Sequence, residues 1–196
     1  PPLSNLQPMK LVDLIEHVEP SVVRIDVVSS QGESIGSGVF VDGSGLIVTN
    51  YHVVQGASSV GLTTSDGKQF KSLGFLHVDM LKDLAVISVD PSELSIFPIA
   101  IARTIPRKGE EVVAFGSPMG FSFSSTQGTV SSIRTGKEIR KALMDLVSVD
   151  VYSLLGYSEK TNWIQMSAAI SGGNSGGPLT NMSGELVGIN TFTNPA

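Results

Sequence analysis

The 196-residue sequence contains no cysteine, few aromatic residues and little charge. The absence of cysteine excludes disulfides, thiolate metal sites and cysteine nucleophiles. No apolar run approaches the roughly 18 residues that a membrane-spanning helix requires. Basic residues are also scarce, because 13 Lys and Arg stand against 18 Asp and Glu, which gives a formal net charge of −5. Nucleic-acid binding depends on clustered Lys and Arg, so we expect neither a nucleic-acid partner nor a membrane span.

The chain is rich in hydrophobic residues and in glycine. Hydrophobic residues make up 41% of the sequence, which is typical of a well-packed globular protein and excludes a disordered one. Most of the 21 glycines separate short runs of Val, Ile, Thr and Phe. Many short strands between turn residues predict an all-β fold. We expect strands over 21–28, 38–41, 46–49, 60–64, 84–89, 111–115, 128–133, 163–168 and 185–191.

Helical periodicity is confined to two stretches. Apolar residues recur at i, i+3, i+4 and i+7 from Leu11 to Val18, which predicts a short amphipathic helix over 9–18 that Pro20 ends. A weaker pattern predicts a second helix over Lys137–Leu146.

The region 96–109 contains prolines and no periodic pattern, so it predicts a connection between two β lobes. We therefore divide the chain into four parts. These are an N-terminal segment with its helix (1–20), a first lobe (21–100), a linker (101–108) and a second lobe (109–196).

Three segments carry the residue types that act together in acyl transfer. His52 ends an apolar strand run, where a rigid scaffold can present a base to a cleft. Asp83 opens another apolar run, where a carboxylate can accept a hydrogen bond from a histidine and fix its tautomer. Ser175 stands in the glycine-rich turn Gly172–Pro178, which exposes its hydroxyl and can aim backbone N–H groups at one point.

Each of these features has an ordinary structural explanation when it is taken alone: a core histidine, a turn aspartate and a glycine-rich hairpin. Together they are more specific, because base, orienting carboxylate and nucleophile occur in the chain order that chymotrypsin-type enzymes use. The order places His52 and Asp83 in the first lobe and Ser175 in the second. It therefore predicts an active-site cleft between the lobes.

The three segments resemble the signature segments of the HtrA/Deg serine proteases. The matching residues are Thr49–Val54, Asp83–Ile87 and Gly173–Leu179, and the similarity covers most of residues 18–193. These proteases are ATP-independent endopeptidases of protein quality control. The resemblance implies a chymotrypsin/trypsin-like, all-β fold of two six-stranded-type antiparallel β-barrels with a short N-terminal helix. It implies no metal and no organic cofactor.

The resemblance also implies a role for each matching residue. His52 would be the general base, Asp83 its orienter and Ser175 the nucleophile. The turn Gly173-Asn174-Ser175 would form the oxyanion hole, with the N–H groups of its first and last residues as donors. Substrate-binding residues would be Ala169 at the base of the specificity pocket with Ile170 beside it, Ile189, Asn190 and Thr191 along the substrate, and Thr193 on the far pocket wall.

Partners and location follow from the same resemblance. We expect polypeptide substrates, a homotrimer joined through the N-terminal segment, a PDZ domain outside this chain, and a periplasmic, organellar or otherwise extracytoplasmic location. The sequence departs from the family at Ser167, where an acidic residue is common, and in the long segment 134–162. It also stops at Ala196, before the family's closing strand, so we expect the second barrel to lack a strand.

Three functions remain open at this point. The leading one is a serine endopeptidase that cleaves unfolded or misfolded polypeptides after small or medium aliphatic residues. A protease-fold chaperone or binding module with a latent or inactive site is the first alternative. An esterase acting on small acyl esters is the second. The presence of all three catalytic residue types favours an active enzyme over an inactive one.

Overall fold

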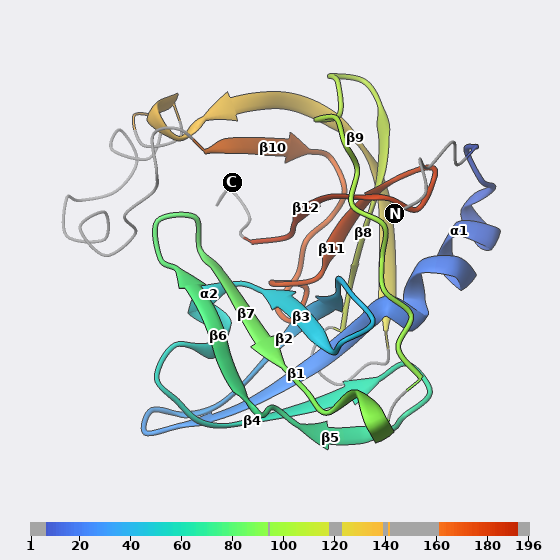
Figure 1. Cartoon of the computed structure of the whole chain (residues 1–196). Helices are drawn as coiled ribbons and strands as arrows, with labels where there is room; N and C mark the ends of the chain where they lie inside the picture. Colours follow the sequence, from blue (N-terminus) through green and yellow to red (C-terminus); the bar gives the residue numbers. More distant parts are fainter. Residues whose placement is uncertain (1–6, 94, 118–122, 139–140, 142–160, 192–196) are drawn as a thin grey trace.

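The computed structural model describes residues 7–93, 95–117, 123–138, 141 and 161–191. Their strands form two curled antiparallel sheets, one of seven strands and one of five (Figure 1). The elements of the first half are α1 (Leu11–Val18), β1 (Val22–Ser29), β2 (Gly32–Phe40), β3 (Leu46–Thr49), α2 (Tyr51–Val54), β4 (Ala57–Thr64), β5 (Gln69–Lys71), β6 (Gly74–Asp79) and β7 (Leu84–Ser88), with one-turn helices at Glu19–Ser21 and Pro91–Glu93. Those of the second half are β8 (Glu111–Gly116), β9 (Ser124–Thr135), β10 (Asn162–Met166), β11 (Pro178–Asn181) and β12 (Leu186–Ile189).

The predicted all-β, trypsin-like class is confirmed, but the strands divide as seven and five rather than six and six within the described residues. The order in the first sheet is β5-β4-β1-β2-β3-β7-β6. Between β5 and β6 the chain changes partners: Ser72 N–H donates to Val60, and Leu73 N–H donates to Ser88. This extended segment is thereby split into β5, which pairs with β4, and β6, which pairs with β7, and the two strands form opposite edges of the sheet.

The second sheet has the order β10-β9-β8-β11-β12, so β10 and β12 are its two edges in the described part of the chain. Ala100, the last residue of the predicted first lobe, and Ala102, in the predicted linker, lie against β12. The N–H of Leu186 donates to Ala100, and the N–H of Ala102 donates to Leu186.

The N-terminal helix closes the seam between the two sheets. Helix α1 lies within the predicted 9–18 and buries Leu14 and Val18. These side chains pack in one cluster with Val22 and Val39 of the first sheet and with second-sheet residues that include Phe115. The shared cluster fixes how the two sheets meet, which matters because the predicted site draws on both.

Of the second predicted helix, residues 137, 138 and 141 are helical and the remainder lies outside the described residues. No helix in the described part of the chain is long and apolar enough to cross a membrane.

Candidate active site

His52 and Asp83 come together because β3 pairs with β7. The pairing sets Thr49 opposite Ala85, so the residues after β3 and before β7 meet at one edge of the sheet. His52 lies on α2, a single helical turn that sequence reasoning missed. The next two residues, Val53 and Val54, are buried in the core of the first sheet and anchor this turn.

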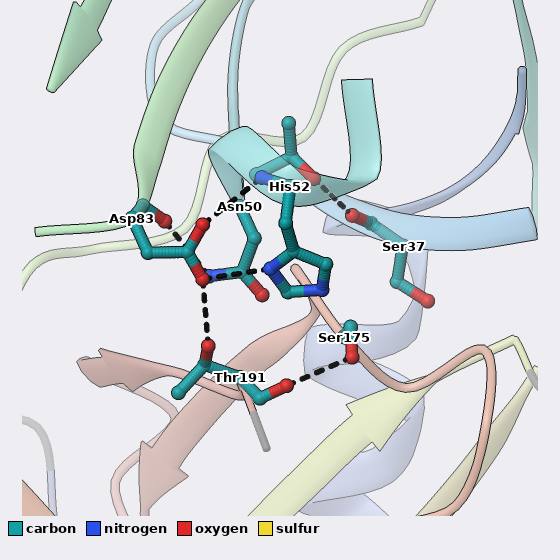
Figure 2. A network of polar contacts seen from close by, with 7 residues as sticks. Ser37, Asn50, His52, Asp83, Ser175 and Thr191 are labelled. Carbon is teal, nitrogen blue, oxygen red and sulfur yellow. Dashed lines mark hydrogen bonds and ion pairs between the residues drawn. The ribbon is translucent and has the colours of Figure 1, made fainter. Parts of the chain in front are cut away.

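Asp83 is 8% exposed as a residue, and both oxygens of its carboxylate are bonded. Its Oδ2 lies 2.7 Å from Nδ1 of His52, and its Oδ1 accepts the backbone N–H of His52 at 2.9 Å. The hydroxyl of Thr191 donates to Oδ2 at 2.8 Å (Figure 2). Burial raises the pKa of Asp83, but the hydrogen bond and charge of His52 outweigh it, so the pKa lies below its ordinary value. The carboxylate is therefore held ionised and aimed at the imidazole.

The backbone of Asp83 is held in a strained conformation. Its φ is +54°, a left-handed value that non-glycine residues rarely adopt. Its carbonyl accepts the Tyr51 N–H at 3.2 Å and the side-chain amide of Asn50 at 3.0 Å. These bonds offset the strain, which for such a conformation costs about 1–3 kcal/mol. Sequence reasoning missed Asn50, although it stands in the same Thr-Asn-x-His segment as His52.

Ser175 lies in a tight turn that packs against both sheets. Gly173 and Gly176 have φ values of +98° and +86°, in the region that glycine adopts without strain. The N–H of Gly176 donates to the carbonyl of Asn190 at 2.8 Å, and the N–H of Asn190 donates to Gly177 at 2.9 Å. The turn is thus fastened to the segment that follows β12.

The Ser175 hydroxyl donates to the carbonyl of Thr191 at 2.9 Å and not to His52. Figure 2 shows the His52 ring between Asp83 and Ser175, with the serine oxygen turned toward Thr191. Within the described residues, neither the N–H of Gly173 nor that of Ser175 donates a hydrogen bond, whereas the N–H of Asn174 donates to Ser171 at 3.1 Å. Two unused backbone donors therefore flank Asn174.

The residues predicted to bind substrate lie in different surroundings. Thr191 lies in the site through both its hydroxyl and its carbonyl. Asn190 is buried, and its side chain donates inward to the carbonyls of Phe115 and Pro178. Ile189 is the last residue of β12, the edge strand next to the Ser175 turn.

The predicted pocket residues are placed in part. Ala169 is exposed, and its carbonyl accepts the Thr126 hydroxyl at 2.8 Å. Ile170 packs against the core of the second sheet. Thr193 lies outside the described residues. No group of three or more potential metal ligands occurs in the part of the chain that the structure describes.

A family model described as a trypsin-like peptidase domain matches residues 36–189. The chain belongs to the trypsin-like peptidase family. It is 36% identical over 191 residues to the serine protease HTRA1A of Danio rerio, covering 93% of this chain and 36% of that protein. It is also 36% identical over 194 residues to the chloroplastic protease Do-like 1 of Arabidopsis thaliana, covering 92% and 40%.

The solved structures agree with these trypsin-like relatives. A serine endoprotease from Yersinia pestis superposes with a TM-score of 0.74 at 31% identity, covering 96% of this chain and 59% of that one. The predicted HtrA/Deg resemblance and trypsin-like fold are therefore confirmed. The chain spans 36% and 40% of the two curated relatives.

Proposed function

We propose that this chain is the protease domain of a serine endopeptidase that cleaves unfolded polypeptides without ATP. The observation that carries the proposal is the 2.7 Å contact between His52 Nδ1 and a buried, ionised Asp83, beside a glycine-flanked serine. A carboxylate at Nδ1 leaves Nε2 of the neutral ring as the proton acceptor. The three residues keep the roles that their order predicts: base, orienter and nucleophile.

The reaction begins when the Ser175 hydroxyl leaves the Thr191 carbonyl and turns toward His52. The cost is small, because exchanging one hydrogen bond for another changes the free energy by about 1 kcal/mol. Oγ attacks the peptide carbonyl carbon while Nε2 of His52 takes the hydroxyl proton. The unused N–H groups of Gly173 and Ser175 bind the oxygen on which negative charge develops. His52 then gives its proton to the leaving amine, and water releases the acyl group by the same route.

Substrate selection rests on the edge after β12 and on the pocket. An extended polypeptide pairs with Ile189–Thr191 as an added strand, which selects unfolded chains over folded ones. Ala169 at the pocket base offers no carboxylate to a substrate Lys or Arg, and burying such a charge unpaired costs several kcal/mol. We therefore expect cleavage after small or medium aliphatic residues. Mass spectrometry of a digested, denatured protein tests this, and a majority of cuts after Lys or Arg would contradict it.

The decisive experiment for the proposed activity compares labelling and turnover in matched variants. A fluorophosphonate should label the wild-type chain but not Ser175→Ala, and casein hydrolysis should fall by about 10⁴-fold or more in that variant. Ser30→Ala, at an exposed turn between β1 and β2, is the control and should behave as wild type. Labelling and turnover that survive in Ser175→Ala would overturn the assignment.

The two alternatives give different outcomes in the same assays. A chaperone module would suppress aggregation of an unfolded protein but would not react with the fluorophosphonate. An esterase would hydrolyse small esters and leave casein intact. The extended backbone at Ile189–Thr191, at the end of β12 away from Leu186, favours a peptide over a small ester.

Assembly and location complete the proposal. We place the chain in an extracytoplasmic or organellar compartment, since one relative is named as chloroplastic. We also propose a homotrimer formed through the N-terminal segment and a PDZ domain outside this chain. Light scattering of the chain with and without residues 1–8 tests the trimer, because a mass that does not change on truncation would exclude that interface.

A further inference from the structure

Ser37 bonds the first sheet to the Ser175 turn. It lies in β2, is fully buried, and bonds the turn in two places. Its hydroxyl donates to the carbonyl of Gly173 at 2.6 Å, and its backbone N–H donates to the carbonyl of Ser175 at 2.8 Å. The same hydroxyl accepts the N–H of Ser117 at 2.8 Å, which ties it to the residue after β8.

The backbone carbonyl of Ser37 completes this contact. It accepts the hydroxyl of Thr49 at 2.6 Å. It also lies so close to Gly176 that a Cβ there would come within 2.1 Å of it. The turn is therefore packed against Ser37 as well as bonded to it.

These bonds fix alternate peptide planes of the turn. The plane from Gly173 to Asn174 is held at its carbonyl by Ser37 and at its N–H by the carbonyl of Ser171. The plane from Ser175 to Gly176 is held at its carbonyl by Ser37 and at its N–H by the carbonyl of Asn190. The unused N–H of Ser175 belongs to the plane between these two, whose carbonyl, that of Asn174, accepts the Gly177 N–H at 3.0 Å. The unused N–H of Gly173 belongs to the plane just before the first fixed one, so its direction depends on the backbone angles of Gly173.

We propose that the Ser37 hydroxyl is a positioning group for the oxyanion hole, acting across the junction of the two sheets. It does not touch substrate in this role. It prevents the peptide after Gly173 from rotating, and that restraint is needed because glycine has more backbone freedom than any other residue. This inference rests on the proposed peptidase function.

The test compares Ser37→Ala with a matched control. Thr180→Val removes another buried hydroxyl, whose bond to the carbonyl of Val113 lies within the second sheet. Steady-state kinetics on a peptide substrate should show kcat lowered about 10- to 100-fold in Ser37→Ala, since loss of one oxyanion donor costs about 10²–10³-fold. KM should stay within about twofold of wild type, because ground-state binding along β12 is untouched. Thr180→Val should keep wild-type kcat.

A second readout separates positioning from general destabilisation. A peptide boronate forms a tetrahedral adduct that places an oxygen in the hole, so its affinity should fall in Ser37→Ala by about the same factor as kcat. If Ser37→Ala does not fold, Ser37→Cys keeps a weaker donor of similar size and should show a smaller loss of kcat at unchanged KM. Wild-type kcat and boronate affinity in the folded Ser37 variant would overturn the inference, as would an equal loss in Thr180→Val.

Failure of the proposed function would look different. A wild-type chain that neither cleaves peptide nor binds the boronate overturns the function, and the role of Ser37 falls with it. An active wild type, an inactive Ser175→Ala and an unaffected Ser37→Ala overturn only the role of Ser37.

Discussion

The site has two halves, His52 with Asp83 on the first sheet and the Ser175 turn on the second, and they differ in how many of their polar groups are already bonded. In the first sheet, both carboxylate oxygens and the carbonyl of Asp83 are bonded, and His52 is held at its backbone and at its ring. In the second sheet, the Ser175 turn keeps two backbone N–H groups unused, and its hydroxyl is bonded to Thr191. The residues that would move the proton, His52 and Asp83, are already hydrogen-bonded to each other in the absence of substrate. The backbone N–H groups that would bind the developing negative charge, those of Gly173 and Ser175, are not yet bonded to any residue that the structure describes.

Backbone strain is handled differently in the two halves as well. Asp83 is a non-glycine residue at φ +54°, and two hydrogen bonds to its carbonyl compensate for the strain. The Ser175 turn uses glycine at its left-handed positions and so avoids the strain altogether. Removing the carboxylate of the first half should therefore impair proton transfer, whereas adding a Cβ to a left-handed glycine of the second half should lower stability.

The largest expected effect is on the first half. Asp83→Asn should lower kcat about 10⁴-fold while the chain stays folded, because an amide in place of the carboxylate favours the wrong histidine tautomer. Steady-state kinetics with circular dichroism as a folding check measure this. Asp79→Asn is the matched control, since Asp79 ends β6 at the start of the same turn and pairs with Lys82 on the surface. Equal losses in both variants would show that the turn, and not the carboxylate of Asp83, is responsible.

The next effect concerns packing of the second half. Gly176→Ala should lower the free energy of unfolding by about 3 kcal/mol or more, because a left-handed alanine costs about 1–3 kcal/mol and overpacking adds a similar amount. Gly67→Ala is the control: its φ of +84° nearly equals the +86° of Gly176, but a Cβ there meets nothing within 4 Å. Urea titration measures the free energy of unfolding of both variants. The loss in Gly67→Ala reports the backbone strain alone, and the additional loss in Gly176→Ala reports the contact of the new Cβ with Ser37. Equal losses would mean that the contact with Ser37 contributes nothing.

A smaller effect should appear at acid pH. Asp83 binds its proton more weakly in the folded chain than in the unfolded one, where the ordinary pKa is 3.8. Its stabilising contribution is therefore complete above that value and is lost as pH falls through the lower folded pKa. Urea titrations between pH 6 and pH 2 should show a steeper loss of stability in wild type than in Asp83→Asn. If stability fell equally with pH in the two proteins, the Asp83 carboxylate would not be ionised and hydrogen-bonded as described.

Much of this arrangement could be predicted from the sequence, because the chemistry resides in short contiguous segments. Ser175 among glycines, His52 after an apolar run and Asp83 before another are each visible locally, and their order predicts that they meet. The β class follows similarly from apolar runs separated by turns.

Contacts between segments far apart in the chain could not be predicted. The bond from Ser37 to Gly173 and that from Thr191 to Asp83 depend on how the two sheets meet, and no local pattern records this. The α2 turn was missed because Tyr51–Val54 is too short for helical periodicity and carries β-branched valines. Splitting of one extended run into β5 and β6 likewise depends on which strands lie beside it.

The smallest effect should come from Thr191, whose side chain bonds the Asp83 carboxylate directly from the segment after β12. Its hydroxyl supplies one of three hydrogen bonds to the Asp83 carboxylate, while its carbonyl accepts the Ser175 hydroxyl. Thr191→Val removes only the side-chain bond, and about 1 kcal/mol of lost orientation corresponds to a roughly fivefold fall in kcat. Thr191→Ser keeps the hydroxyl and should restore most of the rate. Kinetics on one peptide substrate compare the pair. If Thr191→Val keeps the wild-type rate, the hydroxyl does not link the two halves, and a loss confined to Thr191→Ser would show that the methyl group is what matters.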